Sequence, residues 1–178
     1  MISVIIPTLN EEARIGALQK VLARETVPNE AILIDGGSED KTTNEAAAAG
    51  AVVLSASGER GAQLVASVNA ARSDIILFLH ADSRFPEGGL TRNSGSMNED
   101  ERFCGGNFRL LFEGDDPFRR WLDGFYVWPQ SHGSCYGDSG IFVRRDVYDT
   151  MGGIRPIALM EDYDFVCCLE AHGNTCFI

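Results

Sequence analysis

The sequence predicts an α/β fold in which a single, mostly parallel central sheet is flanked by helices. Short apolar runs rich in Val, Ile and Leu recur along the first half of the chain, and this composition is typical of strands buried on both faces. These runs are residues 3–7, 31–35, 51–55 and 75–79. Helical segments separate them, and a repeated strand–helix–strand order predicts a parallel sheet with right-handed crossovers.

The three predicted crossover helices are residues 11–24, 42–49 and 61–72. The first helix places Ile15, Leu18 and Leu22 on one face, at the three- and four-residue spacing of an amphipathic helix. The second is rich in alanine, and Gly50 is placed to cap its carboxyl end. Each crossover can therefore cover the sheet with an apolar face.

The second half of the chain has a different pattern. Residues 92–102 are polar and indicate an exposed loop or a frayed helix end. The further elements expected are strands at 103–112 and 141–143, and helices at 117–125, 145–151 and 161–172. We expect one domain over residues 1–178.

Composition narrows the class of protein. The chain has 178 residues, of which 44% are hydrophobic and 23% charged, as in ordinary globular proteins. Its net charge of −11 argues against a general nucleic-acid-binding surface. No apolar run is long enough to span a bilayer, and no targeting signal precedes the first strand. The five cysteines are odd in number and lack zinc-site spacing, so we expect reduced thiols and a cytoplasmic location.

Polar groups follow each of the four predicted parallel strands, where open α/β sheets bind their ligands. The segments are PTLNEE at 7–12, DGGS at 35–38, GERGAQ at 58–63 and HADS at 80–83. Each has a simpler explanation: Thr8 and Glu11 fit a helix capping box, and Asp35 fits a glycine turn. Arg60 fits a surface arginine and Asp82 a turn. Because all four segments meet at one edge of the sheet, a binding site is the better interpretation.

Two common nucleotide sites are excluded by the loop after the first strand. It carries neither a Gly-x-Gly-x-x-Gly turn nor a P-loop. A sugar nucleotidylyltransferase, which needs a glycine-rich, basic loop there, remains a weaker alternative, because this loop carries Asn10, Glu11 and Glu12.

Taken together, SVIIPTLNEE at 3–12, DGGS at 35–38 and LFLHAD at 77–82 resemble the N-terminal half of a family 2 glycosyltransferase with the GT-A fold. YGDSGIFVRR at 136–145 followed by MED at 160–162 resembles the radical-SAM/selenodomain-associated transferases within it. The resemblance covers essentially the whole chain, and it implies a nucleotide-binding half at 1–84 and an acceptor and catalytic half at 85–178. It implies transfer of a sugar from a nucleoside-diphosphate donor, usually a UDP-sugar, to an acceptor hydroxyl.

The resemblance also implies a donor site. Its residues are Pro7, Thr8, Glu11, Asp35, Gly37, Arg60, Gln63, His80, Ala81 and Asp82. In it, Asp35 would accept a hydrogen bond from the uracil imide and Arg60 would lie near the ribose or diphosphate. Asp82 matches the last acid of the family's Asp-x-Asp motif, which binds Mn²⁺ or Mg²⁺ on the diphosphate. His80 takes the place of the first acid of that motif.

The Glu161–Asp162 pair, at the start of the last predicted helix, matches the position of the family's catalytic base. Helical spacing leaves Asp162 pointing away from Glu161, toward a cleft. Acids in a first helical turn can also simply complement the helix dipole. With the other motifs present, we interpret Asp162 as the base of an inverting, metal-assisted transfer, with Glu161 beside it. The motif Gln-x-x-Arg-Trp of processive synthases is absent, which favours transfer of a single sugar.

Departures from the family pattern support a second hypothesis, a degenerate member that binds nucleotide without turnover. They are His80 and the Cys167–Cys168 pair, which stands where the subgroup is rich in arginine. The family continues past Ile178, so we expect a C-terminally truncated acceptor half, with some acceptor or peripheral membrane contacts outside this chain. A non-enzymatic interaction domain is disfavoured by the number of convergent polar motifs. The sequence identifies neither the donor sugar, the acceptor nor the oligomeric state.

Overall fold

The central strands divide their side chains between two separate hydrophobic cores. In β4 (Ile75–Phe78), Ile75 and Leu77 belong to one core, whereas Ile76 and Phe78 belong to the other. The adjacent strand β1 (Ile2–Thr8) alternates in the same way. This two-residue period buries both faces of the strands, which is why they read as continuous apolar runs.

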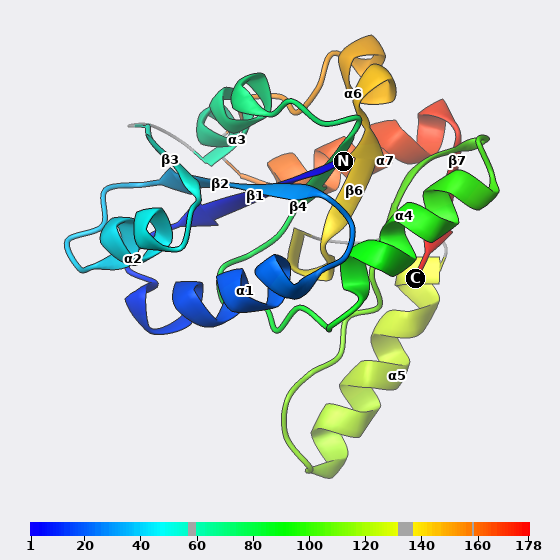
Figure 1. Ribbon diagram of the computed structural model, residues 1–178. Coiled ribbons are helices and arrows are strands. Elements are labelled where there is room, and N and C mark those ends of the chain that lie inside the picture. Colours follow the sequence, from blue (N-terminus) through cyan, green and yellow to red (C-terminus); the bar gives the residue numbers. More distant parts are fainter. Residues whose placement is uncertain (57–59, 132–136, 158) are drawn as a thin grey trace.

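The computed structural model describes residues 1–56, 60–131, 137–157 and 159–178 (Figure 1). The predicted features at Gly58, Glu59, Cys135 and Tyr136 lie outside these ranges. The described cysteines are all free thiols, as the sequence predicts for them: Cys104, Cys167, Cys168 and Cys176.

Within the described residues one seven-stranded sheet has the order β3-β2-β1-β4-β6-β5-β7. The strands not yet bounded are β2 (Asn29–Asp35), β3 (Val52–Ser55), β5 (Phe103–Asn107), β6 (Ile141–Arg144) and β7 (Asn174–Phe177). The four N-terminal strands pair in parallel, which confirms the predicted crossover sheet. β5 and β7 also pair in parallel, whereas β6 is antiparallel to both of its neighbours, β4 and β5. Most strand pairings are therefore parallel.

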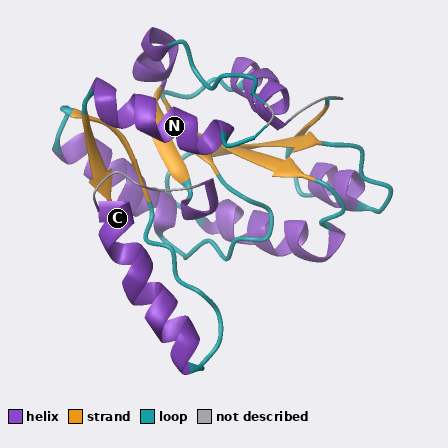
Figure 2. Cartoon of the chain, turned by 180° about the vertical axis from the view of Figure 1, so that it is seen from behind, coloured by secondary structure: helices purple, strands orange, loops and turns teal. Residues whose placement is uncertain are grey.

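Helices cover both faces of this sheet. They are α1 (Glu12–Arg24), α2 (Thr42–Ala48), α3 (Arg60–Ala70), α4 (Gly89–Glu99), α5 (Pro117–Ser131), α6 (Arg145–Met151) and α7 (Glu161–His172). α1, α2 and α4 contribute to one core, and α3, α6 and α7 to the other. α5 extends away from the sheet in both ribbon views (Figures 1 and 2). No helix in the described part of the chain is both long and apolar enough to cross a bilayer.

Three predicted elements need correction. The polar segment 92–102, expected to be a loop or frayed helix end, lies largely in α4, because Leu90, Asn93 and Met97 bury one face of a regular helix. The strand expected over 103–112 ends at Asn107, where the chain leaves the sheet. The helix expected to end at residue 125 continues to Ser131.

One strand was not predicted, whereas a predicted cap is confirmed. After α7 the chain forms β7, which pairs in parallel with β5. Gly50, at φ +90°, ends α2 by donating its backbone N–H to the Ala47 carbonyl over 3.0 Å.

The topology defines one functional edge of the sheet. β1 lies between β2 and β4, so the crossovers diverge from it and leave a crevice at the carboxyl ends of the strands. The segments after β1, β2 and β4 all reach this edge. The antiparallel strand β6 starts there, because Ile141 pairs with Phe78 at the end of β4.

Candidate active site

The turn after β2 is held by the carboxylate of Asp35. The Asp35 side chain is buried and accepts backbone hydrogen bonds from Gly37 at 3.1 Å and from Ser38 at 3.0 Å. Gly37 has φ +104°, which a residue with a Cβ rarely adopts. The glycine-turn interpretation of Asp35 is thus confirmed, and any role toward a nucleotide base would be additional.

The capping-box interpretation of Thr8 and Glu11 is wrong. The Thr8 hydroxyl donates across the sheet to the Ile34 carbonyl at 3.3 Å and caps no helix. The Glu11 carboxylate instead pairs with Arg14 at 3.0 Å, and the Glu11 backbone N–H donates to the Thr42 hydroxyl at 2.7 Å. Contacts with other elements therefore hold these residues at the sheet edge, and not the local helix capping that was the simpler expectation.

Gln63 joins α3 to the same edge. An added Cβ on Gly36 would lie 3.5 Å from the Gln63 amide nitrogen, so the side chain packs against this turn. The Gln63 amide also donates to the Ala56 carbonyl at 3.3 Å. The structure thus gathers the predicted residues after β1 and β2 and the first turns of α3.

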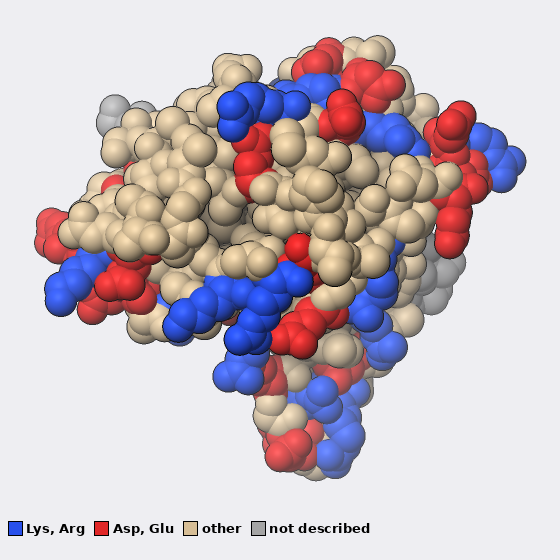
Figure 3. All heavy atoms as spheres, viewed as in Figure 1, with Lys and Arg blue, Asp and Glu red and all other residues tan. Residues whose placement is uncertain are grey.

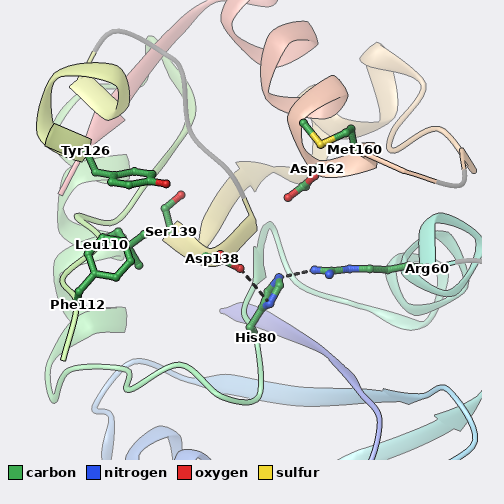
Figure 4. Close-up of a pocket in the computed structure, with 9 residues that line it drawn as sticks. All are labelled: Arg60, His80, Leu110, Phe112, Tyr126, Asp138, Ser139, Met160 and Asp162. Atoms are coloured by element: carbon green, nitrogen blue, oxygen red, sulfur yellow. Dashed lines mark hydrogen bonds and ion pairs between the residues drawn. The ribbon is translucent and has the colours of Figure 1, made fainter. Parts of the chain in front are cut away.

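A cavity of about 360 Å³ lies beside this cluster (Figure 4). Its lining is Arg60, His80, Leu110, Phe112, Tyr126, Asp138, Ser139, Met160 and Asp162. Three of the predicted site residues are in this set: Arg60 from α3, His80 after β4 and Asp162 from α7. Sequence positions about a hundred residues apart therefore share one concave surface, the usual form of a small-molecule site.

Arg60, His80 and Asp138 form a chain of polar contacts across the cavity floor, drawn as dashed lines in Figure 4. The Arg60 guanidinium contacts His80 Nε2, and His80 Nδ1 lies 3.3 Å from the Asp138 carboxylate. This arrangement fits a neutral imidazole that accepts from Arg60 and donates to Asp138.

Electrostatics support the neutral form of His80. Burial and the nearby Arg60 charge lower the pKa of His80 below its ordinary value, although the charges of three carboxylates oppose this. The opposing carboxylates are Asp138, Asp82 and Asp162. His80 is therefore uncharged at neutral pH, and the surrounding charge at this edge is predominantly negative.

Glu161 lies against Arg60 and does not line the cavity. Its carboxylate is buried, 3.0 Å from the Arg60 Nε, and so helps to orient the guanidinium. A second contact joins the same elements, because an added Cβ on Gly61 would lie 3.0 Å from the Arg155 carbonyl oxygen. The start of α3 and the segment before α7 are therefore closely packed.

Asp162 points from the first turn of α7 into the cavity (Figure 4). Its Oδ1 accepts the Tyr163 backbone N–H at 2.8 Å. This confirms the predicted separation of the pair, with Glu161 turned to Arg60 and Asp162 to the cleft. A carboxylate beside a cavity is suited to accept a proton from a bound hydroxyl group.

The opposite wall of the cavity was not predicted. It consists of Leu110, Phe112 and Tyr126, whereas Met160 lies beside Asp162. Leu110 and Phe112 lie in the segment expected to be a strand, which instead passes along the cavity. Asp138 is part of the motif noted at 136–145 but had no assigned role, and the sequence gives no signal that α5 approaches this wall.

Pro7, Ala81 and Asp82 lie outside the cavity lining. Pro7 and Ala81 are mostly buried, whereas Asp82 is exposed and acts on His80 through its charge. In the described part of the chain no three His, Cys, Asp or Glu side chains form a metal-binding group. Asp82 and Asp138, whose charges both act on His80, nevertheless offer oxygen ligands of the type that Mg²⁺ and Mn²⁺ prefer.

Comparison with known proteins assigns the family. Residues 3–152 match the sequence profile of Glycosyl transferase family 2. The chain belongs to this family. The search of curated proteins found no match to this family 2 chain.

Solved structures place the family 2 chain in the GT-A fold. The mannosyltransferase PcManGT from Pyrobaculum calidifontis, in complex with GDP-Man and Mn²⁺, matches with a TM-score of 0.78 and 16% identity over 99% of this chain and 53% of that one. S. aureus TarS 1-349 matches with a TM-score of 0.76 and 17% identity over 98% of this chain and 56% of that one. Glucosyl-3-phosphoglycerate synthase from Mycobacterium tuberculosis, in complex with UDP, matches with a TM-score of 0.60 and 23% identity over 82% of this chain and 57% of that one. The chain thus spans little more than half of these proteins.

Proposed function

We propose that this domain transfers a single sugar from a UDP-sugar to an acceptor hydroxyl, with inversion at the anomeric carbon. The observation that carries the proposal is the cavity in which the Asp162 carboxylate faces Arg60 and His80 beside the sheet edge. Family membership and the GT-A fold support the reaction class. The motifs at 136–145 and 160–162 support a place among the radical-SAM/selenodomain-associated transferases.

In the proposed reaction Asp162 takes the proton of the acceptor hydroxyl while its oxygen attacks the anomeric carbon. The bond from that carbon to the diphosphate oxygen breaks, and its electron pair leaves with the nucleoside diphosphate. Arg60, oriented by Glu161, stabilises the negative charge on the leaving group. Asp35 accepts the imide N–H of uracil, a donor that adenine does not offer in the same position.

A divalent cation fits this site for an electrostatic reason. Asp82, Asp138 and Asp162 all act on His80, so a diphosphate entering here meets concentrated negative charge. Asp82, with Asp138, would hold Mn²⁺ or Mg²⁺ through carboxylate oxygens. When bound, the ion would neutralise charge on the diphosphate.

We expect UDP to bind at least about tenfold more tightly with Mn²⁺ than with EDTA, a difference of roughly 1.4 kcal/mol. Asp82→Ala should abolish this difference, since the substitution removes the proposed ligand. Calorimetric titration of both proteins measures it. The matched control is Asp149→Ala, which removes an exposed acid from α6, at the opposite edge of the sheet. Equal UDP affinity of the unmodified protein in Mn²⁺ and EDTA would remove Asp82 from the metal site.

Asp35→Asn tests base selection without removing the turn, because the remaining amide oxygen can still accept from Gly37 and Ser38. The new NH₂ group would face the uracil N–H, donor against donor. We expect UDP affinity to fall by about tenfold or more, the value of a lost hydrogen bond to a charged group, and ADP affinity to stay unchanged. Parallel titrations with UDP and ADP measure the gap, and thermal unfolding reports on the turn. Equal losses for both nucleotides would make Asp35 a turn residue only.

The alternative, nucleotide binding without turnover, is favoured by His80, which stands where the family has the first acid of its Asp-x-Asp motif. Slow hydrolysis of UDP-sugars in Mn²⁺, without any acceptor, separates the hypotheses. Release of UDP that depends on Asp162 supports the transferase. UDP binding with no release from any of several UDP-sugars would support the alternative.

A further inference from the structure

The cavity has two chemically different sides. One side carries the charged or polar groups of Arg60, His80 and Asp162, which the proposed function uses. The other side presents Phe112 and Tyr126, whose ring centroids lie 5.3 Å apart. A donor diphosphate needs the first side only, so the aromatic side is available to the acceptor.

α5 also exposes an aromatic face outside the cavity. Phe118, Trp121 and Phe125 are 65%, 57% and 54% exposed, and their spacing places them on one side of the helix. The Phe118 and Trp121 rings stack at 5.8 Å, and the Trp121 and Phe125 rings stack at 5.1 Å. Exposed apolar surface of this kind usually marks a binding surface.

The two aromatic regions are continuous. Phe125 packs edge-on against Tyr126 with 5.6 Å between ring centroids, and Tyr126 lines the cavity. A series of ring contacts therefore runs from Phe118, near the projecting end of α5, through Trp121, Phe125 and Tyr126 to Phe112. This continuity connects the exposed face to the place where Asp162 would activate a hydroxyl group.

Charge does not explain this face. Basic and acidic side chains are interspersed over the projecting part of the molecule (Figure 3), and the charged residues of α5 itself are two arginines and one aspartate. Arg119 pairs with Asp123 at 3.1 Å, and Arg120 donates to the Asp115 carbonyl at 2.7 Å. A ligand that follows α5 would therefore be recognised by apolar contact.

We infer that the acceptor is an amphipathic alcohol, with its hydroxyl group at Asp162 and its apolar chain lying along the aromatic face of α5. The inference rests on the proposed function, because it assigns the acceptor of the same site. The ring series gives such a chain a continuous apolar path from the cavity to the end of α5, which neither a free sugar nor a small polar alcohol would use.

The test compares two alcohols with the same head group, methyl β-glucoside and octyl β-glucoside, below the micelle concentration and with UDP and Mn²⁺ present. A fully buried methylene group improves affinity by about fourfold. With partial burial of the seven added groups, we expect octyl glucoside to bind at least about tenfold more tightly in calorimetric titrations. Trp121→Ser and Phe125→Ser should remove most of this advantage and leave UDP affinity unchanged. Val52→Ser, which removes an exposed apolar side chain from β3, should have no effect.

Other outcomes overturn the inference in distinguishable ways. Equal affinity for the two glucosides, with UDP binding intact, would overturn it and leave the proposed function standing. Self-association or binding to phosphatidylcholine vesicles that is lost in Trp121→Ser, without a chain-length effect, would assign α5 to a second copy or to a bilayer instead. Absence of UDP binding to the unmodified protein would overturn the proposed function itself.

Discussion

Asp162→Asn is expected to reduce sugar transfer by roughly 10² to 10⁴-fold, the contribution of a general base, while UDP affinity stays unchanged. The asparagine keeps the size of the side chain and the oxygen that accepts from Tyr163, but it cannot take a proton at neutral pH. UDP should still bind, because the donor residues belong to other elements. The measurement is acceptor-dependent turnover or background UDP-sugar hydrolysis, with UDP titrated in parallel.

Two neighbouring acids provide controls for this experiment. Asp164 lies in the same helical turn but pairs with Arg155 and is absent from the cavity lining, so Asp164→Asn should have little effect on turnover. Glu161→Gln should act differently again, by weakening UDP binding through Arg60. Full turnover in Asp162→Asn would contradict the assignment. If that variant lost UDP binding as well, the residue would instead have a structural role.

Gly106→Ala is expected to lower the free energy of unfolding by about 3 kcal/mol, at the upper end for overpacked cores. Gly106 lies in β5, between β6 and β7. A Cβ there would fall on the Cys176 carbonyl oxygen, and it would be 2.9 Å from Cys176 C and from Phe142 Cζ. Two of these three atoms are backbone of β7, so no side-chain rotation relieves the clash. Urea denaturation measures the loss.

Gly124→Ala is the matched control for that substitution. Gly124 lies inside α5 and an added Cβ would meet nothing within 4 Å. Alanine is favoured over glycine in a helix interior by about 1 kcal/mol, so this variant should be slightly more stable. Comparable destabilisation of both variants would show that steric contact at β7 is not the cause.

The first half of the fold was predictable because its central strands β1 and β4 are buried on both faces and because α1 and α3 each bury an apolar face. In the second half, the pattern of apolar residues in the sequence does not match the positions that are buried in the fold. α4 is polar in sequence, yet Asn93 occupies a fully buried position at which an apolar residue would have revealed the helix. β7 is short and exposed at both ends, and it depends on pairing with β5.

The candidate site shows the same limit. Arg60, His80 and Asp162 were identifiable because each belongs to a motif with a recognisable position at the end of a strand or the start of a helix. The contacts that position these residues could not be predicted, because they join distant parts of the chain. Glu161, for example, orients Arg60 from about a hundred residues away in the sequence. The aromatic wall was missed for a similar reason: an alternating segment at 108–112 resembles a strand until the tertiary structure turns it along the cavity.

α5, which contributes Tyr126 to this wall, does not pack into either hydrophobic core. None of the described α5 side chains belongs to either hydrophobic cluster, whereas every other helix contributes to one of them. Substitutions along its exposed face should therefore change which molecules the domain accepts at little cost in stability. Because the sheet and the nucleotide edge would stay unaltered, α5 is the place to engineer new acceptor specificity.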